Sequence, residues 1–198
     1  MPFAYDIPPS SGALRQGELL ANVWVHRVDH SAISIPKGSV PEVESEVHPL
    51  VIVMTAECDL YQDFAARLPQ QQAQEAHRPD MEDRSRTYLI PHVLLCDMYE
   101  EGRIKVQVPA GSQIWKRIIQ NQDERYHHLQ AAPVGDPSCT ELPALFLDFK
   151  KTFSLPTQSL CDGVSDVAVE RLAVVPPVYI HDLMHRFYGF LSRVGLPE

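Results

Sequence analysis

The order of apolar and polar residues along the chain predicts several strands. Residues 17–28 partly alternate, with Val23 and Val25 on one face, and residues 50–54 form an unbroken, largely β-branched run that is typical of a strand buried on both faces. Further strands are expected at 87–95, 103–108, 126–130 and 144–149. Residues 29–48 are expected to connect strands, and the polar stretch 70–85 is expected to be a solvated loop or a frayed helix.

Two segments follow a helical period instead. After Ser112, apolar residues recur at helical spacing up to Ile119, which predicts a short middle helix. A longer stripe predicts a C-terminal helix that begins near Pro177 and runs to residue 194. Its members are Ile180, Leu183, Met184, Phe187, Leu191 and Val194.

The pattern as a whole predicts an α+β fold in a single domain. Residues 1–13, which hold three prolines, are expected to be a flexible N-terminal arm, so that order begins near Leu14 and the domain spans 14–198. With 198 residues, of which 44% are hydrophobic and 22% charged, the composition is that of a folded globular chain.

Charge and hydropathy restrict the setting of the protein. The chain has 17 Lys and Arg against 26 Asp and Glu, a net charge of −9, which argues against a protein that coats nucleic acid. It has no apolar run long enough to span a bilayer, and its N-terminus does not resemble a signal peptide. We therefore expect a cytoplasmic protein without membrane contact, of undetermined oligomeric state.

The segment 55–59, directly after the buried strand, holds the first candidate chemistry. Cys58 would be a nucleophile if a histidine such as His48 or His127 lay within hydrogen-bond distance, and otherwise it is a core thiol. Asp59 would join Cys58 in a metal site, or would cap a helix over 60–68. The spacing selects no ion, and no cofactor is expected.

A second candidate site combines basic and aromatic residues. Trp115, Lys116, Arg117 and Arg125 lie close in sequence to Tyr126, a combination that contacts phosphates and stacks on bases in RNA-binding proteins. The alternative is a solvated helix face with a packed tryptophan. The partner would be RNA or another protein.

Two further residues are candidates for either chemistry or packing. His127 and His128 are adjacent, so in a strand they face opposite sides and only one can serve a given site. Asp148 falls in an apolar strand, where it is either an acid or metal ligand or the partner of Arg117 or Arg125 in an ion pair.

Two short motifs stand out near the predicted first strands: Leu14-Arg-Gln-Gly-Glu-Leu-Leu and His48-Pro-Leu-Val-Ile-Val-Met-Thr55. They are similar to the first strands of the SH3-like barrel in the PemK/MazF-like family, which the chain resembles in this part. The resemblance implies a small, strongly bent antiparallel β-barrel and a toxin-type ribonuclease. Thr55 would then match the hydroxyl that assists RNA cleavage, whereas His48 stands where the family has an arginine, so the chemistry would change from charge stabilisation to acid–base catalysis.

A second resemblance is to uncharacterised bacterial proteins with a Ser-Gln-x-Cys-Asp-Leu strand end. The matching segments here are Thr55-Ala-Glu-Cys-Asp-Leu60 and Arg193-Val-Gly-Leu-Pro197, and the likeness implies no activity. The leading hypothesis is therefore a bacterial binding or regulatory module related to toxin or defence barrels. The alternative is an enzyme: a ribonuclease using Thr55 and His48, or a hydrolase using Cys58 and a histidine.

Overall fold

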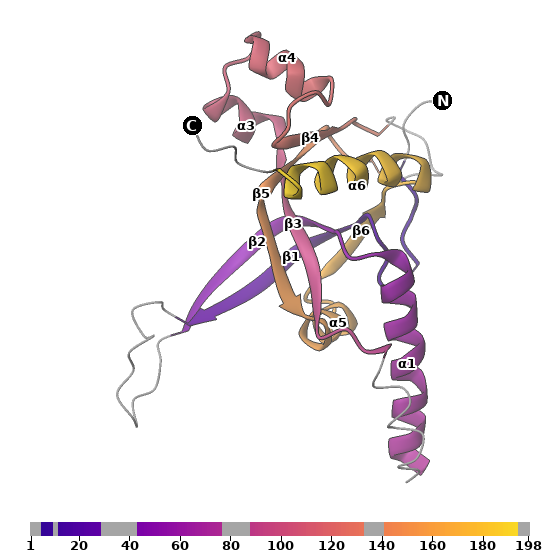
Figure 1. The fold of residues 1–198 in the computed structure, drawn as a ribbon. Coiled ribbons are helices and arrows are strands. Elements are labelled where there is room, and N and C mark those ends of the chain that lie inside the picture. The colour runs from indigo at the N-terminus through magenta and orange to yellow at the C-terminus, as the bar shows by residue number, and fades with distance from the viewer. Residues whose placement is uncertain (1–4, 10–11, 29–42, 77–87, 133–140, 194–198) are drawn as a thin grey trace.

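A six-stranded antiparallel sheet forms the centre of the protein. The computed structural model describes residues 5–9, 12–28, 43–76, 88–132 and 141–193 (Figure 1). The strands are β1 (Glu18–Val28), β2 (Val43–Val53), β3 (His92–Glu100), β4 (Tyr126–Leu129), β5 (Leu145–Pro156) and β6 (Glu170–Val174). Their order is β4-β5-β3-β2-β1-β6, with β4 and β6 at the edges. The α+β prediction is confirmed, but the described strands form an open sheet, and the closed SH3-like barrel is not confirmed.

Helices surround this sheet. They are α1 (Glu57–Ala76), α3 (Glu101–Gln107), α4 (Gln113–Ile119), α5 (Thr157–Ser165) and α6 (Pro177–Leu191). Helix α6 crosses one face of the sheet, while α3 and α4 lie at one end of the molecule and α5 at the other (Figure 1). Within the described residues, no helix has the length and apolarity that crossing a bilayer requires.

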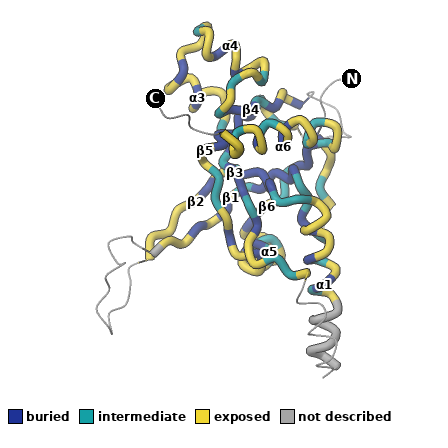
Figure 2. Tube along the Cα trace, in the orientation of Figure 1, coloured by how far each residue is buried: buried dark blue, intermediate teal, exposed yellow. Residues whose placement is uncertain are grey.

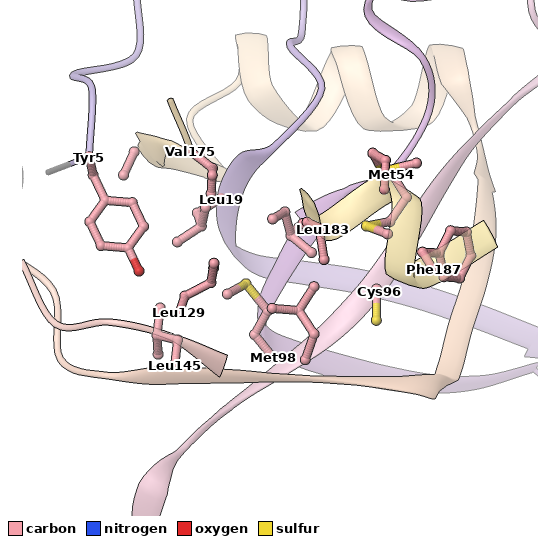
Figure 3. Close-up of a cluster of buried hydrophobic side chains, with 14 of the residues drawn as sticks. Tyr5, Leu19, Met54, Cys96, Met98, Leu129, Leu145, Val175, Leu183 and Phe187 are labelled. Carbon is pink, nitrogen blue, oxygen red and sulfur yellow. The ribbon is translucent and has the colours of Figure 1, made fainter. Parts of the chain in front are cut away.

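The larger hydrophobic cluster lies under α6. Leu183 and Phe187 of α6 pack with Leu19, Met54 and Met98 of the central sheet region (Figure 3). A fully buried aromatic ring such as Phe187 stabilises a core by several kcal/mol relative to alanine, roughly 3–5 kcal/mol. Helix α6 is therefore held by the stripe that its sequence predicts.

Cys96 belongs to the same cluster and is fully buried. Burial raises the pKa of its thiol to about 12, and Sγ donates a hydrogen bond to the carbonyl oxygen of Asp148 at 3.3 Å. The thiol therefore stays protonated and acts as a core side chain.

The second cluster covers the opposite side of the sheet. Val51, Val53 and Leu95 pack there with Leu60 of α1 and Leu160 of α5. Consecutive residues of β2 thus enter different clusters, since Ile52 lies in the first and Val53 in the second. The prediction that residues 50–54 are buried on both faces is confirmed.

Two predicted elements are wrong. Residues 103–108, expected as a strand, lie largely in helix α3, where Ile104 is buried and Val106 is 87% exposed. A strand would place both on one face, whereas a helix separates them. Residues 43–48, expected to connect, belong to β2, where their pairing with β1 overrides their polar composition. The rest of that segment, 29–42, lies outside the described residues.

Other boundaries also differ from expectation. Helix α1 begins at Glu57 and reaches Ala76, so Asp59 lies in its first turn and is not its cap. Strand β3 begins at His92, directly after Pro91, and continues to Glu100. Helix α5 and strand β6 were not predicted. The helices at 113–119 and 177–191 are confirmed, the first with the Ser112 side chain accepting a hydrogen bond from Trp115 N at 3.1 Å.

The N-terminal arm is only partly as expected. Tyr5 is fully buried in the larger cluster, and Asp6 pairs with Val174 through backbone hydrogen bonds of 2.9 and 2.8 Å. Tyr5 and Asp6 thus contact the body of the protein ahead of Leu14, because the apolar ring of Tyr5 has a place in the core, and the flexibility of the arm stays a prediction. Residues 1–4, 10 and 11 of the arm lie outside the described residues.

Candidate functional site

The segment after β2 serves to join elements. Thr55 Oγ1 accepts a hydrogen bond from Leu94 N at 2.7 Å, which ties the end of β2 to β3. Glu57 pairs with Arg15 Nε at 2.8 Å and accepts a hydrogen bond from Gln16 N at 2.6 Å. The hydroxyl is thus used in fixing the end of β2, and the carboxylate in fixing the start of α1.

Cys58 is exposed in the first turn of α1. Its Sγ donates to Oδ1 of Asp59 at 3.5 Å, and no histidine among the described residues hydrogen-bonds to it. The described residues also contain no cluster of three or more potential ligands that includes Cys58 and Asp59. The structure therefore does not bring together the predicted cysteine or metal site.

His48 and Thr55 also stand apart. They lie seven residues from one another along β2 and its extension, which corresponds to roughly 20 Å at the rise of an extended strand. An acid–base pair acting on one phosphate must lie within hydrogen-bond distance of it. These two residues therefore do not form the ribonuclease site that the resemblance implied.

The basic and aromatic patch is divided by the fold. Trp115 is 7% exposed and packs with Ile118 and Phe146, so its ring is not available to stack on a base. Arg125 binds both carboxylate oxygens of Asp148, the ion pair that the sequence suggested. Only Lys116 and Arg117 of the patch remain as exposed cations on α4.

His127 is buried between the sheet and α6. Its Nδ1 lies 3.1 Å from Nε of Arg186, which donates the hydrogen bond, and Nη2 of the same guanidinium donates to Tyr126 O at 2.8 Å. Burial and the Arg186 charge lower the pKa of His127 to about 3. The neutral imidazole is therefore a fixed acceptor that docks α6 on β4.

A shallow cavity of about 350 Å³ lies beside this contact. It is lined by Gln122, Asp123, Glu124, His185, Arg186, Gly189, Phe190 and Arg193. Three of its charged side chains are already engaged: Arg193 pairs with Glu124 at 2.8 Å, and Arg186 donates to the backbone carbonyls of Asp123 and Tyr126. The cavity therefore offers little free charge to a ligand, and another surface of the protein is the stronger candidate site.

That surface is the outer part of strands β1 and β2, residues 22–28 and 43–50, which we call the β1–β2 ribbon. Strand β6 pairs with β1 only over 18–21, and β3 pairs with β2 only over 51–53. Beyond these positions the two strands pair only with each other among the described residues, and they project from the body of the molecule (Figure 1). A two-stranded ribbon of this kind is marginal on its own.

One face of the β1–β2 ribbon packs on the body. Val23 and Val25 are buried in the second hydrophobic cluster, as their alternation predicts. His48, the cross-strand partner of Val23, is also buried. This face anchors the base of the ribbon.

The other face exposes apolar side chains. Trp24 pairs directly with Val47, and these side chains are 52% and 38% exposed. The next pair outward is His26 with Ser45, joined by a hydrogen bond of 2.8 Å, and Val43 beyond it is exposed as well. Figure 2 shows the outer part of β2 as a largely exposed trace. The alternation of 17–28 places Trp24 on the face opposite Val23 and Val25, and this is the sequence signal that points to the exposed surface.

A small polar network fixes the base of the ribbon. Nδ1 of His48 donates to Oδ1 of Asp97 at 2.6 Å, and the hydroxyl of Tyr99 donates to Oδ2 at 3.1 Å. The imidazole also packs on Phe153, with ring centroids 4.2 Å apart. Burial and the Asp97 carboxylate raise the pKa of Tyr99, which keeps its hydroxyl protonated as a donor.

The second nitrogen of His48 is left without a hydrogen bond. Nε2 is buried, and the nearest carboxylate oxygen, Oε2 of Glu46, lies 3.7 Å away, beyond hydrogen-bond distance. His48 is thus held through Nδ1 and its ring face, and it couples the ribbon to β3.

Replacing His48 by alanine is expected to loosen the ribbon. The loss of the bond to Asp97 and of the contact with Phe153 removes about 1–3 kcal/mol of local stability. Amide hydrogen exchange in residues 22–28 and 43–48 should then accelerate by about tenfold or more.

His26→Ala is the matched control, because this histidine lies on the exposed face of the same ribbon. Exchange at residues 51–53, inside the sheet, should be unchanged in both variants. Equal acceleration in the two variants would contradict the anchoring role of His48.

Comparison with known proteins adds no relative. No family model matches the chain, and neither does any curated protein or any solved structure.

Proposed function

We propose that this chain is a protein-binding module and that the β1–β2 ribbon is its contact surface. The observation that carries the proposal is the exposed Trp24–Val47 pair on a ribbon with few neighbours. Exposed apolar patches on soluble proteins mark interaction sites, and tryptophan is the residue most enriched among side chains that dominate binding energy. A partner would bury this pair and add stability to the ribbon.

The ribbon's charges favour a protein over RNA. It carries Glu44 and Glu46 against a single exposed arginine, Arg27, within a chain of net charge −9. A nucleic-acid surface needs the opposite sign. The positions of His48, Thr55 and Cys58 give no support to the enzymatic alternatives. We also propose a role in a bacterial defence or toxin-related system and kinship with SH3-like barrels. These two points are supported by the sequence resemblance alone.

Selection from a library of random 12-residue peptides tests the proposal. Peptides would be selected on the wild-type protein and depleted on a Trp24→Ser/Val47→Ser variant. Because truncating a central interface tryptophan costs about 2 kcal/mol or more, Trp24→Ala should weaken the selected peptides by about 30-fold.

Tyr188→Ala is the matched control, since Tyr188 is an aromatic residue of similar exposure (56%) on α6. The Tyr188→Ala variant should bind the selected peptides with the same affinity as the wild type. If no peptide is enriched, or if both variants weaken binding equally, the ribbon is not the contact surface.

A further inference from the structure

The outer edge of β2 is open to pairing with an added strand, and this indicates what kind of partner the ribbon would bind. On the side away from β1, residues 43–50 of β2 have no paired strand among the described residues. Every second residue of such an edge directs its N–H and C=O groups outward, where they can pair with an added strand. Addition of an extended segment to an exposed edge is an established mode of peptide recognition.

Side chains along this edge alternate between two chemistries. Cross-strand pairing places Val47, Ser45 and Val43 on the face of Trp24, which is apolar or neutral. Glu44 and Glu46 lie on the opposite face. A strand added beside β2 would therefore meet apolar groups on one face and carboxylates on the other.

The acidic face is only partly neutralised within the ribbon. Arg27 stands opposite Glu44, and its Nη2 lies 3.5 Å from Oε2 of Glu46, so one exposed cation serves two carboxylates. Arg27 and Glu46 are both more than half exposed. Surface pairs of this kind contribute little, so the carboxylates remain open to a further cation.

A second copy of this chain does not satisfy the same edge. Two β2 edges related by a two-fold axis would pair antiparallel, with Glu44 facing Glu46 of the second copy if Ser45 lies on the axis, or Glu46 facing itself if that residue does. Like charges directly opposite one another destabilise a strand pair. In these two registers the glutamates therefore oppose pairing of two copies through the β2 edge.

We infer that the β2 edge of the ribbon binds an extended segment of another protein in which basic and apolar residues alternate. Lysine or arginine side chains of that segment pair with Glu44 and Glu46, and its apolar side chains extend the surface formed by Val47 and Trp24. This inference rests on the proposed function and specifies the partner of the same surface.

Three synthetic nine-residue peptides test the inference. One alternates lysine with valine, one alternates glutamate with valine, and one has the lysines and valines in two separate blocks. The protein carries Trp115→Phe, which leaves Trp24 as its only tryptophan, so that emission from Trp24 reports binding directly. We expect the alternating lysine peptide to bind at least about tenfold more tightly than either of the others.

Charge reversal provides the decisive comparison. Glu44→Lys/Glu46→Lys should reverse the preference toward the glutamate peptide, whereas Glu170→Lys/Asp182→Lys, which changes net charge equally at exposed positions outside the ribbon, should not. Thermal unfolding of each variant verifies that it is folded. An unreversed preference overturns the inference.

The outcomes also separate this inference from the proposed function. If library peptides bind in a Trp24-dependent manner but lack alternating basic residues, the inference falls and the function stands. If no Trp24-dependent peptide exists, both fall. Concentration-dependent dimerisation lost in Trp24→Ala, or quenching of Trp24 by a single-stranded RNA oligonucleotide, would identify a different occupant and overturn the inference.

Discussion

Replacing Arg171 by leucine is expected to lower the free energy of unfolding by about 3–5 kcal/mol. Its guanidinium binds both carboxylate oxygens of Glu18, a side chain that is fully buried in β1. Glu18 also accepts a hydrogen bond from Arg15 N at 2.9 Å. Removing the arginine leaves a buried carboxylate with one neutral donor, so the desolvation cost is no longer offset.

Urea denaturation measures this loss. Arg27→Leu is the control, because Arg27 is an exposed arginine whose ion pair on the ribbon should contribute less than about 1 kcal/mol. The double variant Glu18→Leu/Arg171→Leu should recover a large part of the stability, since it leaves no buried charge. If Arg171→Leu lowers the free energy of unfolding no more than Arg27→Leu does, the burial of the Glu18 carboxylate does not depend on Arg171.

Acidification below pH 6.5 is expected to destabilise the protein through His127. Its pKa is about 3 in the folded state against about 6.5 when unfolded, so between these values the unfolded chain binds a proton that the folded protein does not. Stability is therefore unaffected above pH 6.5 and falls as pH decreases, with a slope of up to about 1.4 kcal/mol per pH unit. By pH 3 the loss is on the order of 4–5 kcal/mol.

His127→Asn isolates this contribution. The asparagine oxygen can accept the hydrogen bond from Arg186 but does not titrate, so the free energy of unfolding should fall less steeply between pH 6.5 and 4 than in the wild type. His26→Asn, at an exposed histidine, should retain the wild-type slope. Identical slopes in all three proteins would contradict the burial of a neutral His127.

Long or strongly patterned segments were predicted well from sequence. The β-branched character of the apolar run at 50–54 favours a strand and the helical spacing of the α6 stripe favours a helix, and the structure confirms both. Helix α3 was missed because Ile104, Val106 and Val108 alternate as a strand would, in a segment too short for the helical period to dominate. Tertiary contacts around the buried Ile104 decide its conformation.

The candidate site could be predicted only in part for a related reason. The pair between Asp148 and Arg125 was anticipated because a buried charge needs a partner and few arginines lie nearby in sequence. The contact of His48 with Asp97 joins residues 49 positions apart, and it depends on the register of β2 and β3. The projection of the ribbon depends on where two neighbouring strands end, which the local sequence of β1 and β2 does not encode.

The burial of Tyr5 has a consequence for the order of folding during synthesis. Its ring lies in a cluster that includes Val175 and Phe187, and the adjacent Asp6 pairs with Val174. Residues 5 and 6 therefore cannot make these contacts until residues 174–187 have been synthesised. Strand β1 likewise lacks its neighbour β6 until residue 174 has emerged from the ribosome. Completion of this sheet is therefore a late event, and nascent chains that stall before β6 leave the edge of β1 unpaired at residues 18–21, where Leu19 and Leu20 would be exposed to chaperones.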